Sequence, residues 1–355
     1  MTALTHILTR RIRQTGPISL AEYMADCLLH PEHGYYTTRD PLGTQGDFTT
    51  APEISQMFGE LLGLCLAQSW LDQGAPVRFT LAEIGPGRGT LMADILRATR
   101  GVPGFHTAAQ VHLIEASPTL RAAQKDRLSD YEVTWCDQVS DLPDAPLWLI
   151  ANEFFDALPI RQFTRKGDGW AETQVGLQDG TLTLGLAAPA PLAALAHRLS
   201  DTTDGDVVEL CPAAAPIVTE IATHLKQGGA AIFIDYGDWR SLGDTFQALE
   251  AHKSVDPLAH PGHADLTAHV DFEALSLAAR SAGVAASQML PQGALLARLG
   301  IAARAEALAR NLSGTALKSH ESAFDRLTSP SEMGTLFKAL ALAPAPDFLP
   351  PGFDA

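Results

Sequence analysis

Cysteine and long apolar runs are both scarce in this sequence, and each shortage excludes a class of protein. The four cysteines, at positions 27, 65, 136 and 211, are widely spaced and form no Cys-x-x-Cys pair, which argues against a disulfide framework or a structural zinc site. No apolar stretch approaches the roughly 20 residues that a membrane helix requires. Residues 1–13 lack the apolar block of a secretory signal, so we expect a cytoplasmic protein with no membrane insertion.

Basic residues are few relative to acidic ones. The 355 residues include 25 Lys and Arg against 41 Asp and Glu, which gives a formal net charge of -16. An acidic surface repels phosphate backbones, so nucleic acid is not an expected partner, and a cationic protein or peptide fits better.

Histidines gather in one segment without forming a metal motif. His252, His260, His263 and His269 have no helical i, i+4 spacing, and Pro261-Gly262 interrupts the segment. We therefore predict no metal site and expect this segment to be a loop that borders the substrate channel.

The order of apolar segments predicts an α/β fold with a Rossmann-like core. Strands are expected at 79–83, 111–115, 133–137, 147–151 and 230–235, with helical patterns between them, which is typical of a doubly wound sheet. Turn signals at 166–169 and 178–180 predict inserted β-hairpins at about 160–200. The expected parts are a helical N-terminal cap at 1–75, the core at 76–290, and a helical C-terminal addition with a loosely attached tail at 291–355.

Local signals indicate further helices outside the alternating segments. Ser19-Leu20-Ala21-Glu22 is a capping box that opens a helix through Leu29. An Ala-rich helical pattern covers 291–311. A longer apolar helix covers 57–71, and its pattern leaves open whether it is buried in the core or lies at the interface of a homodimer.

The segment Glu83-Ile84-Gly85-Pro86-Gly87-Arg88-Gly89-Thr90 is the strongest functional signal. Its glycines follow a strand and open a helix, the context in which backbone can approach a nucleotide closely. A dinucleotide fingerprint requires its third glycine at position 90, where Thr90 stands. The shortened pattern favours a cofactor without a pyrophosphate, and Glu83 can hold the ammonium group of an amino-acid-bearing nucleoside. We therefore predict S-adenosyl-L-methionine as the cofactor.

Acidic residues at the ends of the next two strands extend this predicted cofactor site. Glu115 can accept hydrogen bonds from both ribose hydroxyls, and Asp137 follows the third strand, where an acid can contact adenine. The alternative for Glu115 is a surface carboxylate that caps the following helix, which begins near Ser117. The alternative for Asp137 is an ordinary acid in a loop. The cofactor-binding candidates are Glu83, Gly85, Gly87, Gly89, Thr90, Glu115, Ser117 and Asp137.

The segment Asn152-Glu153-Phe154-Phe155-Asp156 follows the fourth strand. Ligands of open α/β sheets bind outside the carboxyl ends of the strands, so this segment is expected to face the transferred methyl group. Its acids and aromatic rings could hold a guanidinium group by paired hydrogen bonds and stacking. The catalytic candidates are Asn152, Glu153 and Asp156; the alternative is a helix start with two core phenylalanines.

Several longer motifs closely resemble the MidA family of class I methyltransferases, over almost the whole chain. The matching segments include His33-Gly34-Tyr35-Tyr36, Gly46-Asp47-Phe48-Thr49-Thr50-Ala51-Pro52-Glu53-Ile54-Ser55, the glycine segment, Asn152 to Pro159, Asp235-Tyr236-Gly237 and Ala264 to Phe272.

The resemblance implies protein arginine N-methylation, because the mitochondrial member of that family dimethylates an arginine of a respiratory complex I subunit. It also implies that the loop from Gly46 to Ser55 closes over cofactor and substrate. The substrate-side candidates are Tyr36, Gly46, Asp47, Phe48, Thr50, Pro52, Glu53, Tyr236 and His269.

Two other functions remain open at this point. A small-molecule or lipid methyltransferase would have a narrow apolar pocket, and a non-catalytic assembly chaperone would use the cofactor only as a stabilising ligand. The Asn152–Asp156 segment weighs against the chaperone, since a pure binding protein does not need it. An NAD-dependent oxidoreductase is disfavoured by Thr90.

Overall fold

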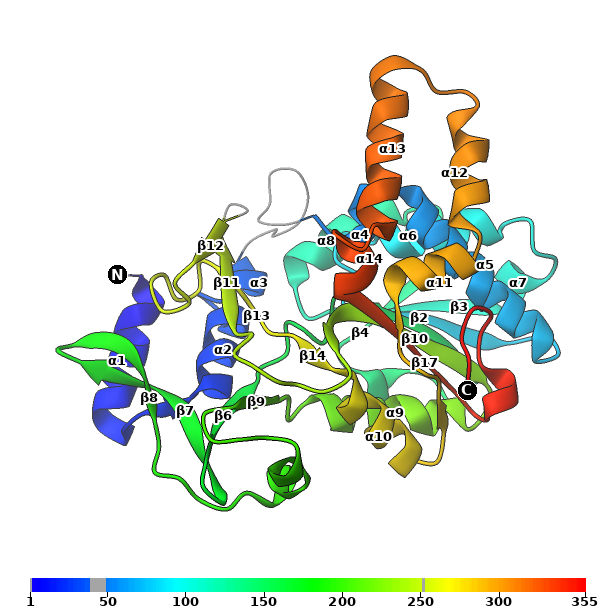
Figure 1. Cartoon of the computed structure of the whole chain (residues 1–355). Helices are drawn as coiled ribbons and strands as arrows, with labels where there is room; N and C mark the ends of the chain where they lie inside the picture. The colour runs from blue at the N-terminus through cyan, green and yellow to red at the C-terminus, as the bar shows by residue number, and fades with distance from the viewer. Residues whose placement is uncertain (1, 39–48, 251–252) are drawn as a thin grey trace.

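The computed structural model describes residues 2–38, 49–250 and 253–355. Over these residues the central sheet has nine strands, in the order β15-β17-β10-β5-β2-β3-β4, with β14 beside β10 and β16 beside β17 (Figure 1). The neighbouring strands β10, β5, β2, β3 and β4 run parallel, and β17 is antiparallel to β10. Their bounds are β2 Phe79–Ile84, β3 Ala109–Ile114, β4 Val133–Cys136, β5 Leu147–Asn152, β10 Gly229–Asp238, β14 Val270–Asp271, β15 Ala285–Ala286, β16 Leu290–Pro291 and β17 Phe337–Ala343.

The five strands predicted from the sequence are confirmed. Every residue of β2 and β5 is buried, which explains why β5 is continuously apolar from Leu147 to Ala151 rather than alternating. The carboxyl ends of these parallel strands meet at one edge of the sheet, so the segments that follow them lie close together.

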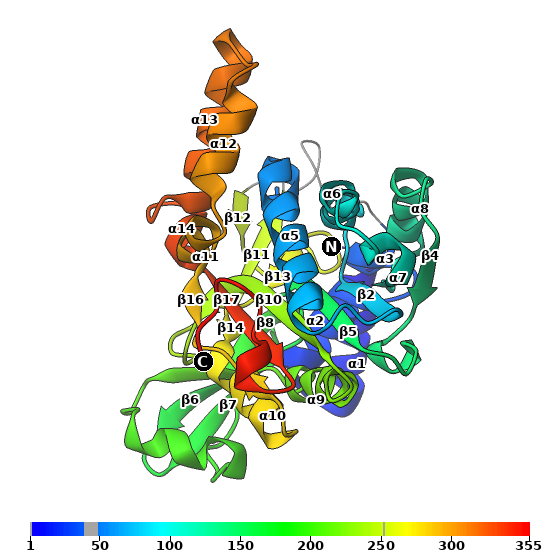
Figure 2. The same ribbon diagram turned by 90° about the vertical axis from the view of Figure 1, so that its right-hand side faces the viewer.

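Helices cover both faces of the sheet (Figure 2). On one face pack α5 (Gln56–Asp72) and α6 (Thr90–Thr99), and on the other α9 (Ala214–Leu225) and α10 (Phe272–Ser281). The long apolar helix α5 is buried along most of its length, which places it in the core; Leu64 and Leu71 are exposed. The homodimer remains a prediction.

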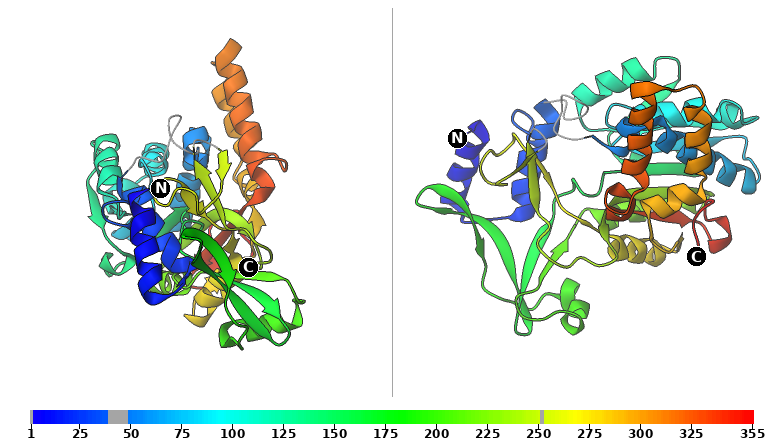
Figure 3. Two further views of the ribbon diagram at one scale, coloured as in Figure 1. Left: turned by 90° about the vertical axis from the view of Figure 1, so that its left-hand side faces the viewer. Right: turned by 45° about the horizontal axis from the view of Figure 1, so that its top comes forward.

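The N-terminal helices form a second lobe together with the inserted hairpins (Figure 3). Ser19 caps α2 (Leu20–Leu29) and Glu22 completes the capping box, as predicted. The strand β1 (Ile18–Ser19) pairs with β7, so residues far apart in sequence share one small sheet. The other elements of this lobe are α1 Ala3–Thr15, α3 Tyr35–Thr38, β6 Arg161–Lys166, β7 Gly169–Gln178, β8 Thr181–Leu186, η2 Ala193–Ser200, β9 Val207–Leu210, β11 Gln247–Glu250, β12 Lys253–Val255 and β13 Asp265–Thr267.

The C-terminal addition is helical, but it also contributes β17 to the central sheet. The helix expected over 291–311 is two helices, α11 (Gln292–Arg298) and α12 (Ile301–Ala309), because Gly300 adopts the left-handed region with φ 88°. The expectation of a loosely attached tail is wrong. Phe353 is buried, and the Cys65 thiol donates to the Pro351 carbonyl at 3.3 Å.

A helical arm made of α12 and α13 (Gly314–Thr328) projects from the core beside α5 (Figures 1 and 2). Its base is held by Glu60, which lies on α5 with a side chain only 4% exposed. The Glu60 carboxylate accepts hydrogen bonds from Arg304 at 2.7 Å and 3.0 Å and from Arg97 at 2.6 Å. No helix among the described residues is long and apolar enough to cross a membrane.

Candidate cofactor and methyl-transfer site

The predicted glycine segment forms the turn between β2 and α6. Gly85, Gly87 and Gly89 have φ values of 64°, 53° and 77°, which residues with a side chain rarely adopt. A Cβ atom on Gly85 would lie 3.1 Å from the Phe154 ring. The turn therefore requires glycine for its conformation, and at Gly85 also for the close approach of the segment that follows β5.

Glu83, at the end of β2, is a buried acid that lines the cavity. Its residue is 3% exposed, and its Oε2 atom has no hydrogen-bond partner among the residues that the structure describes. Burial raises the pKa of Glu83 to about 8, and the nearby Glu115 carboxylate adds to the shift. A buried acid with an unused oxygen is suited to an ammonium group, which would return it to the charged form.

Glu115 directly follows β3 and also lines the cavity. Its Oε1 accepts the Ser117 N–H at 2.7 Å, and its Oε2 accepts a hydrogen bond from the Gln124 amide at 3.1 Å. Burial raises the pKa of Glu115, and these donors oppose the rise. The predicted alternative, that Glu115 caps the next helix, applies to Ser117 instead, whose hydroxyl accepts the Leu120 N–H at the start of α8 (Pro118–Arg127).

Gln124 is a functional candidate that the sequence did not indicate. It lies on α8, is fully buried, and donates to the Gly87 carbonyl at 2.7 Å as well as to Glu115. Its own carbonyl oxygen accepts the Trp135 indole N–H at 2.8 Å. A glutamine within a helix has no distinctive spacing, so only the three-dimensional contacts identify it.

Asp137 lies at the cavity rim, and its side chain is 85% exposed and paired with Arg121 at 2.5 Å. The neighbouring Gln138 and Val139 also line the cavity. The predicted contact of Asp137 with adenine remains a prediction, and its carboxylate is committed to an ion pair in this structure.

The segment after β5 forms a tight turn rather than a helix start. Glu153 adopts a left-handed conformation with φ 51°, and its Oε1 accepts hydrogen bonds from the Asn152 amide and from the Ala51 N–H, each at 3.0 Å. Burial raises the pKa of Glu153 to about 7; the two hydrogen bonds oppose the shift, and Asp156 adds to it. Glu153 therefore changes protonation near neutral pH.

Asn152 and Asp156 both keep an unused buried oxygen. Neither Asn152 Oδ1 nor Asp156 Oδ1 has a partner within the described part of the chain. Burial raises the pKa of Asp156, whereas a hydrogen bond from the Tyr236 hydroxyl lowers it. Asn152 and Glu153 line the cavity and Asp156 lies behind them, so the three catalytic candidates are brought together but do not share one surface.

The substrate-side candidates divide into two groups. Tyr36, Thr50, Pro52 and Glu53 line the cavity, whereas Tyr236 and His269 pack edge to face behind it, with ring centroids 5.5 Å apart. Gly46, Asp47 and Phe48 lie outside the described residues.

The short helix α4 (Ala51–Ile54) contacts the site at both of its ends. Thr90 donates its hydroxyl hydrogen to Glu53 Oε1 at 2.5 Å, and the Ala51 N–H reaches Glu153.

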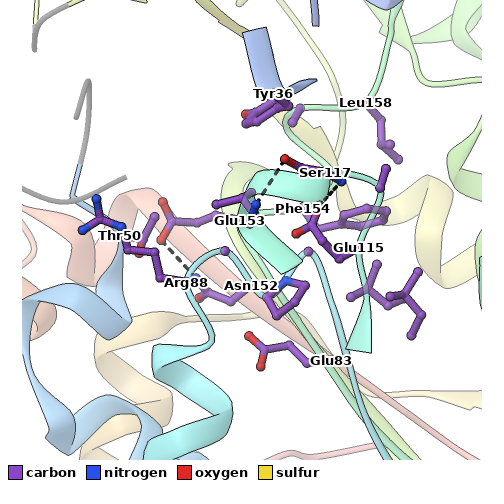
Figure 4. A pocket seen from close by; sticks show the side chains of 18 of the residues that line it. Tyr36, Thr50, Glu83, Arg88, Glu115, Ser117, Asn152, Glu153, Phe154 and Leu158 are labelled. Carbon is purple, nitrogen blue, oxygen red and sulfur yellow. Dashed lines mark hydrogen bonds between the residues drawn. The ribbon is translucent and has the colours of Figure 1, made fainter. Parts of the chain in front are cut away.

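Together these residues enclose a cavity of about 340 Å³ at the carboxyl ends of β2, β3 and β5 (Figure 4). Figure 4 shows Glu83, Glu115 and Glu153 around it, with Phe154 and Leu158 to one side and Tyr36 at the far end. Buried acids thus form one part of the wall, and apolar side chains form another. In the part of the chain that the structure describes, no group of three His, Cys, Asp or Glu residues could hold a metal ion.

Comparisons with known proteins identify the family to which this chain belongs. Residues 61–290 match a family model described as "Putative S-adenosyl-L-methionine-dependent methyltransferase". The chain is 37% identical to the mitochondrial protein arginine methyltransferase NDUFAF7 of Xenopus tropicalis, over 96% of this chain and 86% of the relative. It is 36% identical to the human protein of that name, over 97% of this chain and 84% of the relative.

A solved structure shares both fold and ligand class. A crystal structure from Burkholderia thailandensis, of a protein described as a "likely methyl transferase", is bound to S-adenosyl-homocysteine. It matches with a TM-score of 0.83 and 29% identity, over 99% of this chain and 93% of that one. The unused Glu83 oxygen, the glycine turn and the buried Glu115 fit such a nucleoside with an amino-acid tail, and their roles in binding it remain predictions. The chain belongs to this family of S-adenosyl-L-methionine-dependent methyltransferases.

Proposed function

We propose that this enzyme methylates an arginine side chain of a protein substrate, and that a respiratory complex I subunit carries this arginine. The observation that supports it most directly is the turn after β5, where the half-buried Glu153 lines the cavity and the buried Asp156 lies behind it. A guanidinium group is effectively always protonated in solution. Two neighbouring acids with raised pKa values can offset that charge, and one of them can accept the proton that methylation releases.

The roles of the chain's own residues follow from their positions. Glu83 would hold the ammonium group of S-adenosylmethionine, and Glu115 would hold the ribose hydroxyls. The bound cofactor supplies the methyl group. Glu153 in its charged form would orient the guanidinium and accept its proton, which suits a base whose pKa lies close to the working pH. No covalent intermediate with the protein is required, because positioning and electrostatics provide the acceleration.

Support for an arginine acceptor also comes from the named relatives, which are protein arginine methyltransferases. The net charge of -16 favours a cationic segment as the partner. Those relatives are named as mitochondrial, and the cytoplasmic location expected for this chain remains a prediction.

The test uses the purified enzyme, S-adenosylmethionine and the organism's own complex I subunits, with methylated peptides identified by mass spectrometry. We expect methylation on an arginine of one subunit, and none when that arginine is replaced by lysine. Transfer to a small molecule instead of protein, or no transfer by an enzyme that binds S-adenosylhomocysteine, would contradict the proposal. The first outcome would favour the small-molecule alternative and the second the assembly chaperone.

A further inference from the structure

Asp235 is a buried acid beside the turn that follows β5, at residues 153–156. It does not line the cavity, and it is not among the candidate site residues. It lies on β10, directly beside the end of β5, and is 1% exposed. Its Oδ2 atom accepts three consecutive backbone N–H groups, from Phe154 at 3.1 Å, Phe155 at 2.9 Å and Asp156 at 3.2 Å. Its Oδ1 atom accepts the Tyr236 N–H at 2.9 Å.

This contact determines the shape of the turn. Three successive N–H groups can converge on one oxygen only if the backbone curls around that oxygen. The curl begins at Glu153, whose left-handed φ of 51° is unfavourable for a residue with a side chain. Such a conformation persists only where the surroundings enforce it. Here the Glu153 N–H donates to the Ile234 carbonyl at 2.9 Å, and Asp235 holds the three residues that follow.

An ionisable residue at this position is costly for the fold. Burial raises the pKa of Asp235 and the Asp156 and Glu153 carboxyls add to the rise, whereas the backbone N–H groups of Asp156 and Tyr236 oppose it. A neutral acceptor would satisfy the N–H groups without placing a third acid next to two others. Hydrogen bonds to a charged acceptor are, however, roughly twice as strong as neutral ones. The contact is therefore better explained by a need for a rigid turn than by packing alone.

We propose that Asp235 is a positioning residue for methyl transfer, which holds the Phe154–Asp156 backbone so that the Glu153 side chain stays at the cavity wall. Asp235 acts through the turn, since its carboxylate does not line the cavity. The Glu153 side chain in turn contacts Asn152 and Ala51, so loss of the anchor also disturbs the contact with α4. The catalytic part of this inference rests on the proposed function, whereas the anchoring part does not.

The anchoring is tested by hydrogen exchange on the S-adenosylhomocysteine-bound protein and on its Asp235→Asn and Asp235→Ala variants. Exchange is measured by mass spectrometry on peptides that cover residues 150–158. Asparagine keeps one oxygen acceptor without the charge, and alanine keeps none. We expect the turn amides to be most protected in the wild type, less in Asp235→Asn and least in Asp235→Ala. Glu209→Gln is the matched control, because Glu209 is also a buried acid that accepts a backbone N–H, and its partners Thr245 and Gln162 lie outside the turn.

Turnover and cofactor affinity are measured on the same variants, with thermal unfolding used to restrict the comparison to folded protein. A misplaced catalytic group can cost about 100-fold in rate, so we expect kcat of Asp235→Ala to fall by about that factor. Affinity for S-adenosylhomocysteine should change much less, and Asp235→Asn should recover part of the loss. If the Asp235→Ala variant does not fold, the comparison of Asp235→Asn with the wild type decides both the anchoring and the catalytic effect.

Unchanged protection of the turn amides in a folded variant would overturn the anchoring. Lost protection with unchanged turnover would overturn the catalytic role. If the wild type methylates no arginine at all, the proposed function fails by itself, and the exchange result still decides whether Asp235 holds the turn.

Discussion

Gln124 donates a hydrogen bond to Glu115 Oε2 at 3.1 Å from the same amide nitrogen that donates to the Gly87 carbonyl at 2.7 Å. One buried side chain thereby fixes the distance between the glycine turn and the acid expected to hold the ribose. Both ends of the Gln124 amide make hydrogen bonds, because its oxygen accepts the Trp135 indole N–H. The predicted cofactor site is consequently held in shape by α8, the helix that begins shortly after Glu115.

Replacing Gln124 with leucine should weaken cofactor binding. A lost hydrogen bond to a charged group costs about 1.5–3 kcal/mol, or roughly 10- to 100-fold in affinity. The measurement is calorimetric titration with S-adenosylhomocysteine and with its 2′-deoxy analogue. The variant should discriminate less between the two, because Glu115 is no longer held. Gln178→Leu, at an exposed position on β7, is the control. Equal discrimination in the variant and the wild type would contradict the role of Gln124.

Cofactor binding should release a proton through Glu83. With a pKa of about 8, Glu83 is mostly protonated at pH 7 in the free protein. An ammonium group beside it favours the carboxylate, so binding should release close to one proton at pH 7 and fewer at pH 9. Titration with S-adenosylhomocysteine in two buffers of different ionisation enthalpy measures this number. Glu83→Gln should bind more weakly without proton release. Release that persists in Glu83→Gln would assign the proton to another group.

Methyl transfer should depend on the ionised form of Glu153. An acid with its pKa near 7 accepts a proton only when deprotonated, so kcat/KM should rise with pH through about 7 and level off above it. A bound guanidinium cation favours the carboxylate, so kcat should level off at a lower pH than kcat/KM.

Glu153→Gln should bind S-adenosylhomocysteine normally and lose turnover by about 100- to 10,000-fold, the range of general base catalysis. Glu172→Gln, in the second lobe, should leave both unchanged. Near-normal turnover of Glu153→Gln would show that another group accepts the proton.

Alanine at Gly85 should lower both stability and cofactor affinity. The φ of 64° costs a residue with a Cβ about 1–2 kcal/mol, and the new atom would press on Phe154. Gly101→Ala is the control, because a Cβ there would meet nothing within 4 Å and the φ is not positive. Urea unfolding and S-adenosylhomocysteine titration measure the two effects. The prediction fails if both glycine variants behave alike.

Much of the core could be predicted because its signals are local. The strand β5 is a short apolar run, and the glycine turn joins β2 to a helix within a few residues. Glu83, Glu115 and Glu153 each follow or end a parallel strand, and the topology of such a sheet brings those ends together.

The features that escaped prediction depend on contacts between distant segments. The sequence marks Asp235-Tyr236-Gly237 as a motif, but the contact of Asp235 with the turn after β5 arises only because β10 and β5 are neighbours, although about eighty residues separate Asp235 from Phe155. The strand β17 is an Ala- and Leu-rich run without alternation, since both of its faces are buried, and its alanines favour a helical interpretation.

Protein chains are synthesised from the N-terminus, and β17 lies late in this one. Until Phe337–Ala343 has left the ribosome, β10 has an open edge where β17 will pair. Asp235 itself is in register with Lys338. A chain interrupted before this strand would hold all the predicted cofactor-binding residues and still lack the strand that pairs with β10 beside the turn after β5. We therefore expect premature termination or proteolytic clipping ahead of β17 to leave a fragment prone to edge-to-edge aggregation rather than a partly active enzyme.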